Sequence, residues 1–481
     1  MGINQGETEI IIMPVKKDAW RFLFNVIQYL FRMQAKPKLN LFDFTMIMVS
    51  FVIGMGIFRT PVNVAANSPS TAIFFAAWIA GGLIAICGAL TYAEIGSRFP
   101  ETGAYYKIFS YAYHPSIAFG VNCIILISNA ASLAGVALIG AEYIVRVILP
   151  TVENAQQIQI GIAIFSILLF YSVNLLGLKM SARTQNVLTL IKIAMILLLI
   201  TPLFFTTGIA PASTTLASAV SPTMMEYIKA FGLGLVAVSF TYGGYQQTIN
   251  FGEEVKDPAR NIPRGIFIGI VIIIILYLAI NFAYVRVIGF DNLKTSTNIA
   301  AILAGHVFGA AAGNILSVLL FLSVLAYVNV LLMSNPRVMQ AMSEEGVLPK
   351  VFSKRTVNSN VLLTSLSVFA SLCALIVFWA KKFDTILSFT IFLDCFGMVL
   401  SAATIFILRK KTKHLDGTGI YKMKLYPLMP LIFIAAYIFV AISIAFDYQK
   451  NDNAALTGIS VLAAFIILYF IMQRFTAKNK A

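Results

Sequence analysis

The chain has 481 residues, of which 59% are hydrophobic and only 11% are charged, with a net charge of +15 and a mean hydropathy of +0.86. An ordinary soluble domain carries about 25% charged residues, so these charges are too few to cover the surfaces of a soluble protein of this length. The basic residues stand in short gaps between long apolar runs and form no basic helix, which excludes a nucleic-acid-binding protein.

A membrane-spanning helix needs about 20 mostly apolar residues, and twelve runs in the sequence qualify. In chain order they cover 41–65, 71–97, 115–149, 156–178, 183–207, 224–251, 264–288, 312–343, 361–380, 383–408, 425–446 and 454–473. We therefore predict an all-α integral membrane protein with 12 transmembrane helices. Ahead of them, 18–34 is apolar but interrupted by charged and amide side chains. This pattern favours an interfacial amphipathic helix in an N-terminal segment, 1–40, over a thirteenth span.

The placement of the basic residues orients the helices. If the N-terminus is inside, 26 of the 35 Lys and Arg residues fall in cytoplasmic segments and seven in outer ones. Basic residues concentrate on the cytoplasmic side of a membrane. We therefore predict a multi-pass protein of the plasma (inner) membrane, surrounded by lipid, with both termini cytoplasmic and a C-terminal tail at 476–481.

Neither the cysteines nor the histidines form a pattern that binds a metal or a cofactor. The four cysteines fall inside apolar runs without paired spacing, which is typical of buried packing residues. None lies in the outer loop between the third and fourth spans, so we expect a monomer or a homodimer without an obligate disulfide-linked partner. The three histidines are far apart, and the loops are too short for a catalytic domain, so no enzyme is indicated.

Glycine pairs interrupt the first and the sixth predicted spans. Gly54 and Gly56 stand near the middle of span 1, and Gly243 and Gly244 near the middle of span 6. Such pairs weaken a helix, although small residues also line many helix interfaces in membranes.

The positions of the two interruptions favour a transporter. Spans 1 and 6 open two blocks of five spans, 41–207 and 224–408. Broken helices at matching positions in two halves indicate a binding site at the bilayer midplane. Because five is odd, the second block inserts upside down, and the span count predicts an inverted repeat.

Unwinding a helix leaves backbone N–H and C=O groups that lipid cannot satisfy. The N–H groups of Met55, Gly56 and Ile57 follow the first break at the start of a half-helix, which suits a carboxylate. The carbonyl groups near the breaks suit an ammonium group; they belong to Ile53, Phe240, Thr241 and Gly243. A zwitterion with both groups on one carbon fits this arrangement, so the predicted substrate is an amino acid.

Several motifs resemble those of a known family. IGMGIFRTP in span 1 resembles the G-S-G-I-F-x-x-P signature of the amino acid–polyamine–organocation (APC) transporters, and YAEIGSRFPETGAYY after span 2 is similar to that family's Y-A-E-L-G motif. Further matches are FTYGGYQQTINFGEEVKDPARNIPRGI, NPRVMQAMSEEGVLP and LRKK, so the resemblance covers about 40–410. It implies the leucine-transporter fold, a 5+5 inverted repeat with broken helices 1 and 6 in a core at 41–408, followed by helices 11 and 12 at 409–475.

The resemblance also implies roles for residues near the second break. Phe240 occupies the position of the family's aromatic gate, which closes over the substrate from outside. Tyr245 stands where many members have Trp, and Gln246 lines the same stretch, so both are expected to bind substrate. Met55 replaces the usual Ser of span 1, which removes a hydroxyl from the carboxylate site but leaves the backbone N–H.

Lys192 lies about ten residues into span 5, at a depth where an ionisable residue indicates function. In relatives a Lys at this position reaches the break in span 1 and replaces a sodium ion, and Ser323 of span 8 is expected as one of its acceptors. Loss of its proton would couple proton movement to the opening of span 1; the alternative is a static cation. In both cases the resemblance implies independence from sodium.

Two further sets of charged residues are candidates. By its distance from Arg409, Asp394 of span 10 matches the family position at the side-chain end of the pocket. It could pair with a cationic substrate, carry a proton, bond a substrate hydroxyl or indole N–H, or only hydrogen-bond between helices. At the inner side, Glu94, Glu253 and Glu254, with the arginines at 260 and 264, are expected to form either a network that stabilises the outward-facing state or ordinary interfacial ion pairs.

Together these features predict a secondary active transporter that moves amino acids by alternating access, independently of sodium, through proton-coupled symport or exchange. A polyamine or organocation carrier is one alternative; its substrate would leave the N–H groups of the first break unused and give Asp394 more importance. An amino acid sensor with the same binding site is the other.

Overall fold

The computed structural model describes residues 39–149, 155–205, 223–296, 299–357, 359–379, 383–446 and 454–478. The amphipathic helix predicted at 18–34 lies outside these ranges. Within them the regular structure is helical, apart from two isolated β-bridges.

Every predicted span corresponds to a helix of the structure, and the chain is a multi-pass integral membrane protein. Seven described spans are long and apolar enough to cross a membrane: α4 (Thr71–Arg98), α6 (Pro115–Ile148), α7 (Ala155–Leu175), α8 (Leu178–Ile200) with α9 (Pro202–Phe205), α10 (Met224–Tyr242) with the 3₁₀ helix η1 (Tyr245–Asn250), α11 (Pro258–Ile288) and α14 (Ala312–Glu344). An eighth is bent by 41° between α2 (Leu41–Val52) and α3 (Gly56–Asn67). The set of twelve is completed by α15 (Leu363–Trp379), α16 (Phe383–Lys411), α17 (Leu428–Phe446) and α18 (Ala454–Lys478).

Three short helices lie in the loops between these spans: α5 (Ala104–Ala112), α12 (Phe290–Thr295) and α13 (Ile299–Phe308). The sequence did not predict α5, because nine residues are too few for a periodic pattern to stand out. It packs against α6, α14 and α16 on the same side as the end of α4.

The two broken helices begin with the same capping arrangement. At α2 the Asp43 N–H donates to Asn40 Oδ1 (2.8 Å), and the Asn40 N–H donates to Asp43 Oδ2 (3.2 Å). At α10, Thr223 and Glu226 make the equivalent reciprocal pair. These capping boxes satisfy N–H groups that a helix start leaves without partners, which fixes where each broken helix begins.

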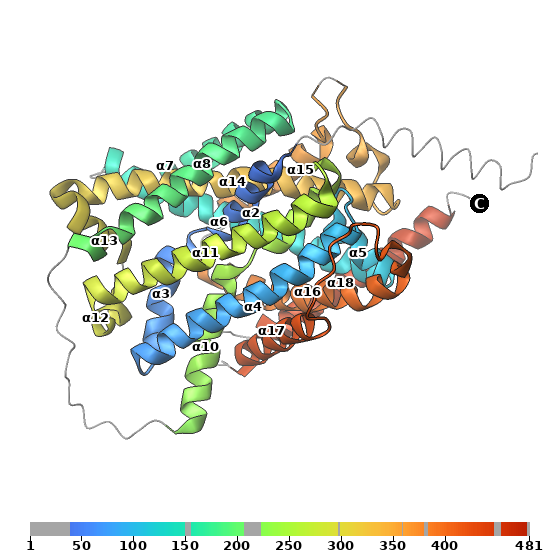
Figure 1. Ribbon diagram of the computed structural model, residues 1–481. Helices are drawn as coiled ribbons and strands as arrows, with labels where there is room; N and C mark the ends of the chain where they lie inside the picture. Colours follow the sequence, from blue (N-terminus) through green and yellow to red (C-terminus); the bar gives the residue numbers. More distant parts are fainter. Residues whose placement is uncertain are drawn as a thin grey trace, which may run out of the picture. The chain divides into compact units, whose positions relative to one another are not determined.

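Helices at matching positions in the two blocks of five pack against each other. The pairs are α3 with α10, α4 with α11, α6 with α14, and α7 with α15; α4 and α11 run side by side in Figure 1. Such pairing is expected when two repeats face each other across an approximate two-fold axis in the membrane plane. It brings the breaks of helices 1 and 6 together in the interior.

Candidate functional site

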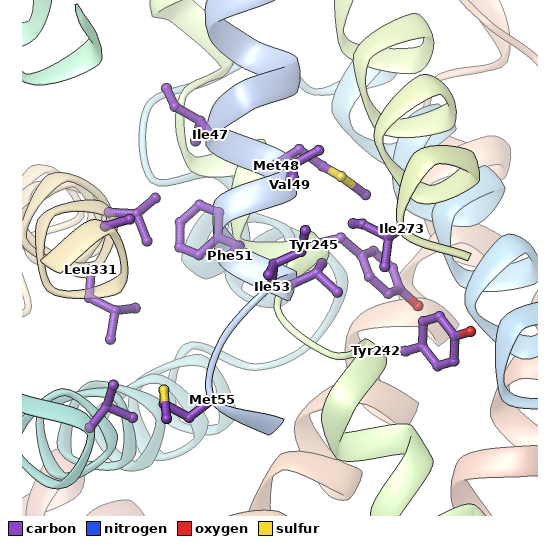
Figure 2. Close-up of a cluster of buried hydrophobic side chains, with 14 of the residues drawn as sticks. Ile47, Met48, Val49, Phe51, Ile53, Met55, Tyr242, Tyr245, Ile273 and Leu331 are labelled. Carbon is purple, nitrogen blue, oxygen red and sulfur yellow. The ribbon is translucent and has the colours of Figure 1, made fainter. Parts of the chain in front are cut away.

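The break in helix 1 replaces one turn of helix with a short connection. Figure 2 shows α2 ending near Ile53 and a non-helical stretch leading to Met55. The Gly54 N–H turns back to the Val52 carbonyl (2.9 Å). Within the described residues, the N–H groups of Met55, Gly56 and Ile57 make no hydrogen bond.

The break in helix 6 lies directly against the first one. Gly244 has φ +111°, and a Cβ there would lie 2.5 Å from the Phe51 carbonyl oxygen, so only glycine fits. The Gly244 N–H donates to the Oε1 of Gln246 (2.9 Å). Close backbone approach at Gly244 therefore holds the two interrupted helices together.

Open space adjoins the first break. A Cβ added to Gly54 would meet no atom within 4 Å, whereas one added to Gly56 would lie 3.1 Å from Thr241 Oγ1. Gly54, Gly243 and Phe240 are partly exposed, while Thr241 is buried. The space thus adjoins N–H groups that have no partner among the described residues, beside the buried side chains of Ile53, Met55 and Ile57.

Most of the carbonyl groups predicted to hold an ammonium group already accept a hydrogen bond. The Ile53 carbonyl accepts from Lys192, the Thr241 carbonyl from the Tyr277 hydroxyl (3.3 Å), and the Phe240 carbonyl from the Gly243 N–H (3.2 Å). A carbonyl oxygen has a second lone pair, so these groups keep one acceptor position each. The carbonyl of Gly243 accepts no bond from any described residue.

Lys192 is fully buried and binds the end of α2. Its Nζ donates to the Ile53 carbonyl (2.5 Å), to the Ser50 carbonyl (3.4 Å) and to Ser50 Oγ (3.3 Å). The three N–H groups of the ammonium therefore face three oxygens of one helix end. We call this set of contacts the Lys192 latch.

Ser50, one serine within the apolar run of span 1, takes the place expected for Ser323 as an acceptor for Lys192. The Ser323 hydroxyl has no hydrogen-bond partner among the described residues. Ser50 stands four residues before Gly54, on the helical turn that precedes the break. This spacing is the one signal that could have identified it.

Asp394 lies on α16, partly buried, and makes no hydrogen bond or ion pair with any described residue. The hydroxyls of Tyr105, Tyr327 and Tyr437 lie within electrostatic reach of its carboxylate. Two of these hydroxyls have serine partners: Tyr327 with Ser132 (2.9 Å) and Tyr105 with Ser401 (3.3 Å). Among the described residues, the carboxylate therefore has tyrosine hydroxyls within electrostatic reach and no cationic partner.

Tyr245 and Gln246 are both buried in the structure. Tyr245 is 1% exposed and its ring packs edge-on against Tyr92, with the ring centroids 6.0 Å apart. Figure 2 shows it directed toward Ile273, on the side of the first break opposite to Met55. Gln246 uses its carbonyl to cap Gly244, so neither side chain lies beside the space at Gly54 in this conformation.

A buried ion-pair cluster surrounds Glu254, in the segment between η1 and α11. Its carboxylate binds Arg337 (2.6 Å) on α14 and Arg355 (3.2 Å), and not Arg260 or Arg264, which had been expected. Burial alone would raise the pKa of Glu254, but the two guanidinium groups outweigh this and hold it below its ordinary value. The cations expected for Glu254 are therefore wrong, because the arginines that pair with it come from segments distant in sequence. Glu253 accepts a hydrogen bond from the Thr102 hydroxyl (3.0 Å).

A second cluster surrounds Glu94 at the end of α4. Its carboxylate accepts from Arg98 (2.7 Å), from Arg409 on α16 (2.6 Å) and from the Met423 N–H (2.8 Å). The start of helix 1 is fixed beside the Glu254 cluster, because Leu39 exchanges backbone hydrogen bonds with Glu254 (2.8 Å) and Lys256 (2.9 Å).

Comparison with known proteins gives consistent matches along the chain. The amino acid permease family matches residues 39–472. The serine/threonine exchanger SteT of Bacillus subtilis (strain 168) is 27% identical over 409 residues, which cover 84% of this chain and 90% of the exchanger. The human large neutral amino acids transporter small subunit 2 is 26% identical over 448 residues, covering 91% and 80%. The methylthioribose transporter of Bacillus subtilis (strain 168) is 27% identical over 467 residues, covering 92% and 95%.

Proposed function

Because this chain belongs to the amino acid permease family, we propose that it is a secondary active transporter that carries amino acids across the membrane by alternating access. It works independently of sodium, through proton-coupled symport or exchange. Its core comprises 41–408, its eleventh and twelfth helices follow at 409–475, and both termini are cytoplasmic in the plasma (inner) membrane.

One observation carries the proposal. Three consecutive N–H groups, on Met55, Gly56 and Ile57, have no partner among the residues that the structure describes. They lie at the start of α3, beside the space at Gly54. An unpaired N–H in an apolar interior is costly unless a ligand accepts from it. A substrate carboxylate is the group that a helix start holds best, and the free Gly243 carbonyl is the first acceptor for the substrate ammonium.

We assign the end of the helices that carries the Glu254 and Glu94 clusters to the cytoplasmic side, and its closure supports assigning this conformation to the outward-facing half of the cycle. All six residues of η1 and nine residues of α2 are buried. Substrate enters from outside and binds between the breaks, Phe240 closes over it, and α2 then swings to open the cytoplasmic path. The Lys192 latch sets the free-energy cost of that swing.

Uptake into proteoliposomes tests the proposal. Labelled serine, leucine and lysine would be offered beside putrescine and methylthioribose, with and without sodium and with and without an inward proton gradient. We expect uptake of at least one amino acid, unchanged by sodium and lost when its carboxylate is esterified. Uptake of putrescine alone would make the protein a polyamine carrier, and binding without uptake would make it a sensor.

The same assay resolves the role of Asp394 through Asp394→Asn. If the carboxylate pairs with a cationic substrate, the variant loses lysine uptake and keeps that of neutral amino acids. If it carries a proton, neutral uptake continues but the gradient no longer drives accumulation. If it only forms hydrogen bonds between helices, the variant keeps its substrate selectivity and its gradient-driven accumulation, and its melting temperature falls.

Gly54→Ala is expected to raise KM at least about tenfold, which corresponds to about 1.4 kcal/mol, without affecting folding. The added methyl group meets no atom of the described residues within 4 Å, but it occupies the space beside the N–H groups. Gly161→Ala on α7 is the matched control, because a Cβ there also meets nothing within 4 Å while the residue is exposed. An unchanged KM for Gly54→Ala, measured from initial uptake rates, would move the carboxylate site elsewhere.

A further inference from the structure

Polar side chains from four helices form one continuous hydrogen-bonded chain in the apolar interior. Asn174 on α7 donates to Asn329 on α14 (2.9 Å), and Asn329 donates to Gln185 on α8 (2.8 Å). Gln185 donates in turn to Ser50 Oγ on α2 (2.5 Å). Asn329, Gln185 and Ser50 are 0% exposed and Asn174 is 8% exposed. We call Asn174, Asn329 and Gln185 the amide chain.

The direction of the amide chain is fixed by backbone carbonyls. The Asn174 amide nitrogen also donates to the Phe170 carbonyl (2.7 Å), and the Asn329 nitrogen to the Ser181 carbonyl (3.2 Å). Because a carbonyl only accepts, neither amide can be reversed without losing a bond. All donors therefore point toward α2, and hydrogen bonds in series reinforce one another in a low-dielectric interior.

The amide chain ends on the Lys192 latch. Ser50 Oγ accepts from both Gln185 and Lys192, which uses its two lone pairs, so the hydroxyl proton is left to the Ala326 carbonyl (3.4 Å). Gln185 thus holds Ser50 in the orientation that presents an oxygen to the ammonium.

No charged side chain of the described residues interacts with Lys192. On α2, Asp43 is bonded to Asn186 (2.7 Å), and on α14, Arg337 is paired with Glu254. The titratable group that faces the latch from α11 is Tyr277, whose hydroxyl donates to the Val52 carbonyl (3.0 Å). The ammonium therefore depends on neutral oxygens alone.

We propose that Gln185 and Asn329 are positioning residues for transport, which set the pH at which Lys192 releases α2 by holding Ser50 in place. The inference rests on the proposed function, because it requires that α2 moves and that Lys192 loses its proton. Buried amides are a costly way to join helices, since apolar side chains of similar volume would serve stability as well. Their cost is explained if the chain acts on the element that moves.

Two substitutions at Gln185 test this proposal, because they should shift the pH midpoint of exchange in opposite directions. Amino acid exchange would be measured in proteoliposomes over the neutral pH range, with equal pH on both sides. Gln185→Glu should move the pH midpoint of exchange upward by about one unit or more, because a nearby carboxylate holds the ammonium proton. Gln185→Met should move it downward, because Ser50 is no longer fixed. A purely structural role would lower the rate in both variants and leave the midpoint in place.

Substitutions at Asn329 repeat the test one residue further from Lys192. Asn329→Asp should raise the pH midpoint of exchange, as Gln185→Glu does but by less, and Asn329→Leu should lower it, as Gln185→Met does. The Asn329 variants replace the Gln185 variants in the test if one of the latter fails to fold. Asn122→Asp is the matched control: Asn122 is equally buried, on α6, and donates to the Ala118 carbonyl of its own helix (2.9 Å). Its midpoint should stay where it is.

Opposite shifts in the two Gln185 variants support the inference. Midpoints that stay fixed or move together, in variants that still bind labelled amino acid, overturn it. A wild type that exchanges amino acids without any pH midpoint overturns both this inference and the role given to Lys192. A wild type that exchanges no amino acid is a failure of the proposed function itself and is recognised without any variant.

Discussion

Replacing Lys192 with methionine is expected to lower amino acid exchange at least about hundredfold and to remove its dependence on pH. Methionine keeps much of the apolar volume but donates no hydrogen bond, so the oxygens of Ser50 and Ile53 lose their shared partner. A hydrogen bond to a charged group contributes about 1.5–3 kcal/mol. Losing even two of the three bonds of the latch shifts the balance between the inward- and outward-facing states by about two orders of magnitude or more.

Lys179→Met is the control for this experiment, because Lys179 lies on the same helix but is exposed. It should leave both the rate and the pH profile of exchange unchanged. If Lys192→Met kept a pH-dependent exchange of wild-type rate, the latch would have no part in the cycle. Rates would be taken from labelled-substrate exchange at equal protein density in the vesicles.

Replacing Glu94 with leucine should cost about 3–5 kcal/mol of stability, because it leaves the largely buried guanidinium of Arg409 without a carboxylate and removes one of the two carboxylates of Arg98, which keeps Asp416 (2.7 Å). The Glu94 and Arg98 side chains are fully buried, and Arg409 is nearly so. At about 2 °C per kcal/mol for a large domain, the melting temperature should fall by roughly 6 °C or more. Thermal unfolding of the purified protein in detergent measures this.

Glu142→Leu provides the comparison for that loss. Glu142 pairs with Arg146 one turn away on α6, but its side chain is 36% exposed and that of Arg146 is 61% exposed. An exposed pair contributes about 0–1 kcal/mol, so the melting temperature should hardly move. Equal losses in the two variants would mean that the Glu94 cluster is no more important for stability than a surface pair.

The number and approximate positions of the membrane spans could be read from the sequence because each span is a run of about 20 apolar residues. The two breaks were also predictable, since Gly54 and Gly244 interrupt runs at matching places. The N–H groups left after the first break were predictable as well, because the first N–H groups of any helix lack partners within the helix. The structure adds that Gly244 lies against Phe51, which no local pattern records.

The contacts between distant segments could not be predicted. Lys192 was a candidate because a charge inside a span stands out, but Ser50 is an ordinary residue of an apolar helix until the crossing of α2 and α8 is known. The same holds for Asn329 and Gln185, since an isolated amide in a span resembles a packing residue. For Glu254, a nearby arginine in the sequence was a poor guide, because its cations lie on α14 and beyond.

The backbone hydrogen bonds of Leu39 have a practical consequence for handling the protein. The chain enters α2 directly from Leu39, which is bonded on both sides to the segment after helix 6. A bulky fusion or a surface tether attached ahead of this point would pull on the helix whose displacement the cycle requires. The last helix, α18, instead packs against α6 and α16. An affinity tag or an immobilisation handle should therefore be placed after α18. An N-terminal attachment would restrain α2 and lower the measured transport rate.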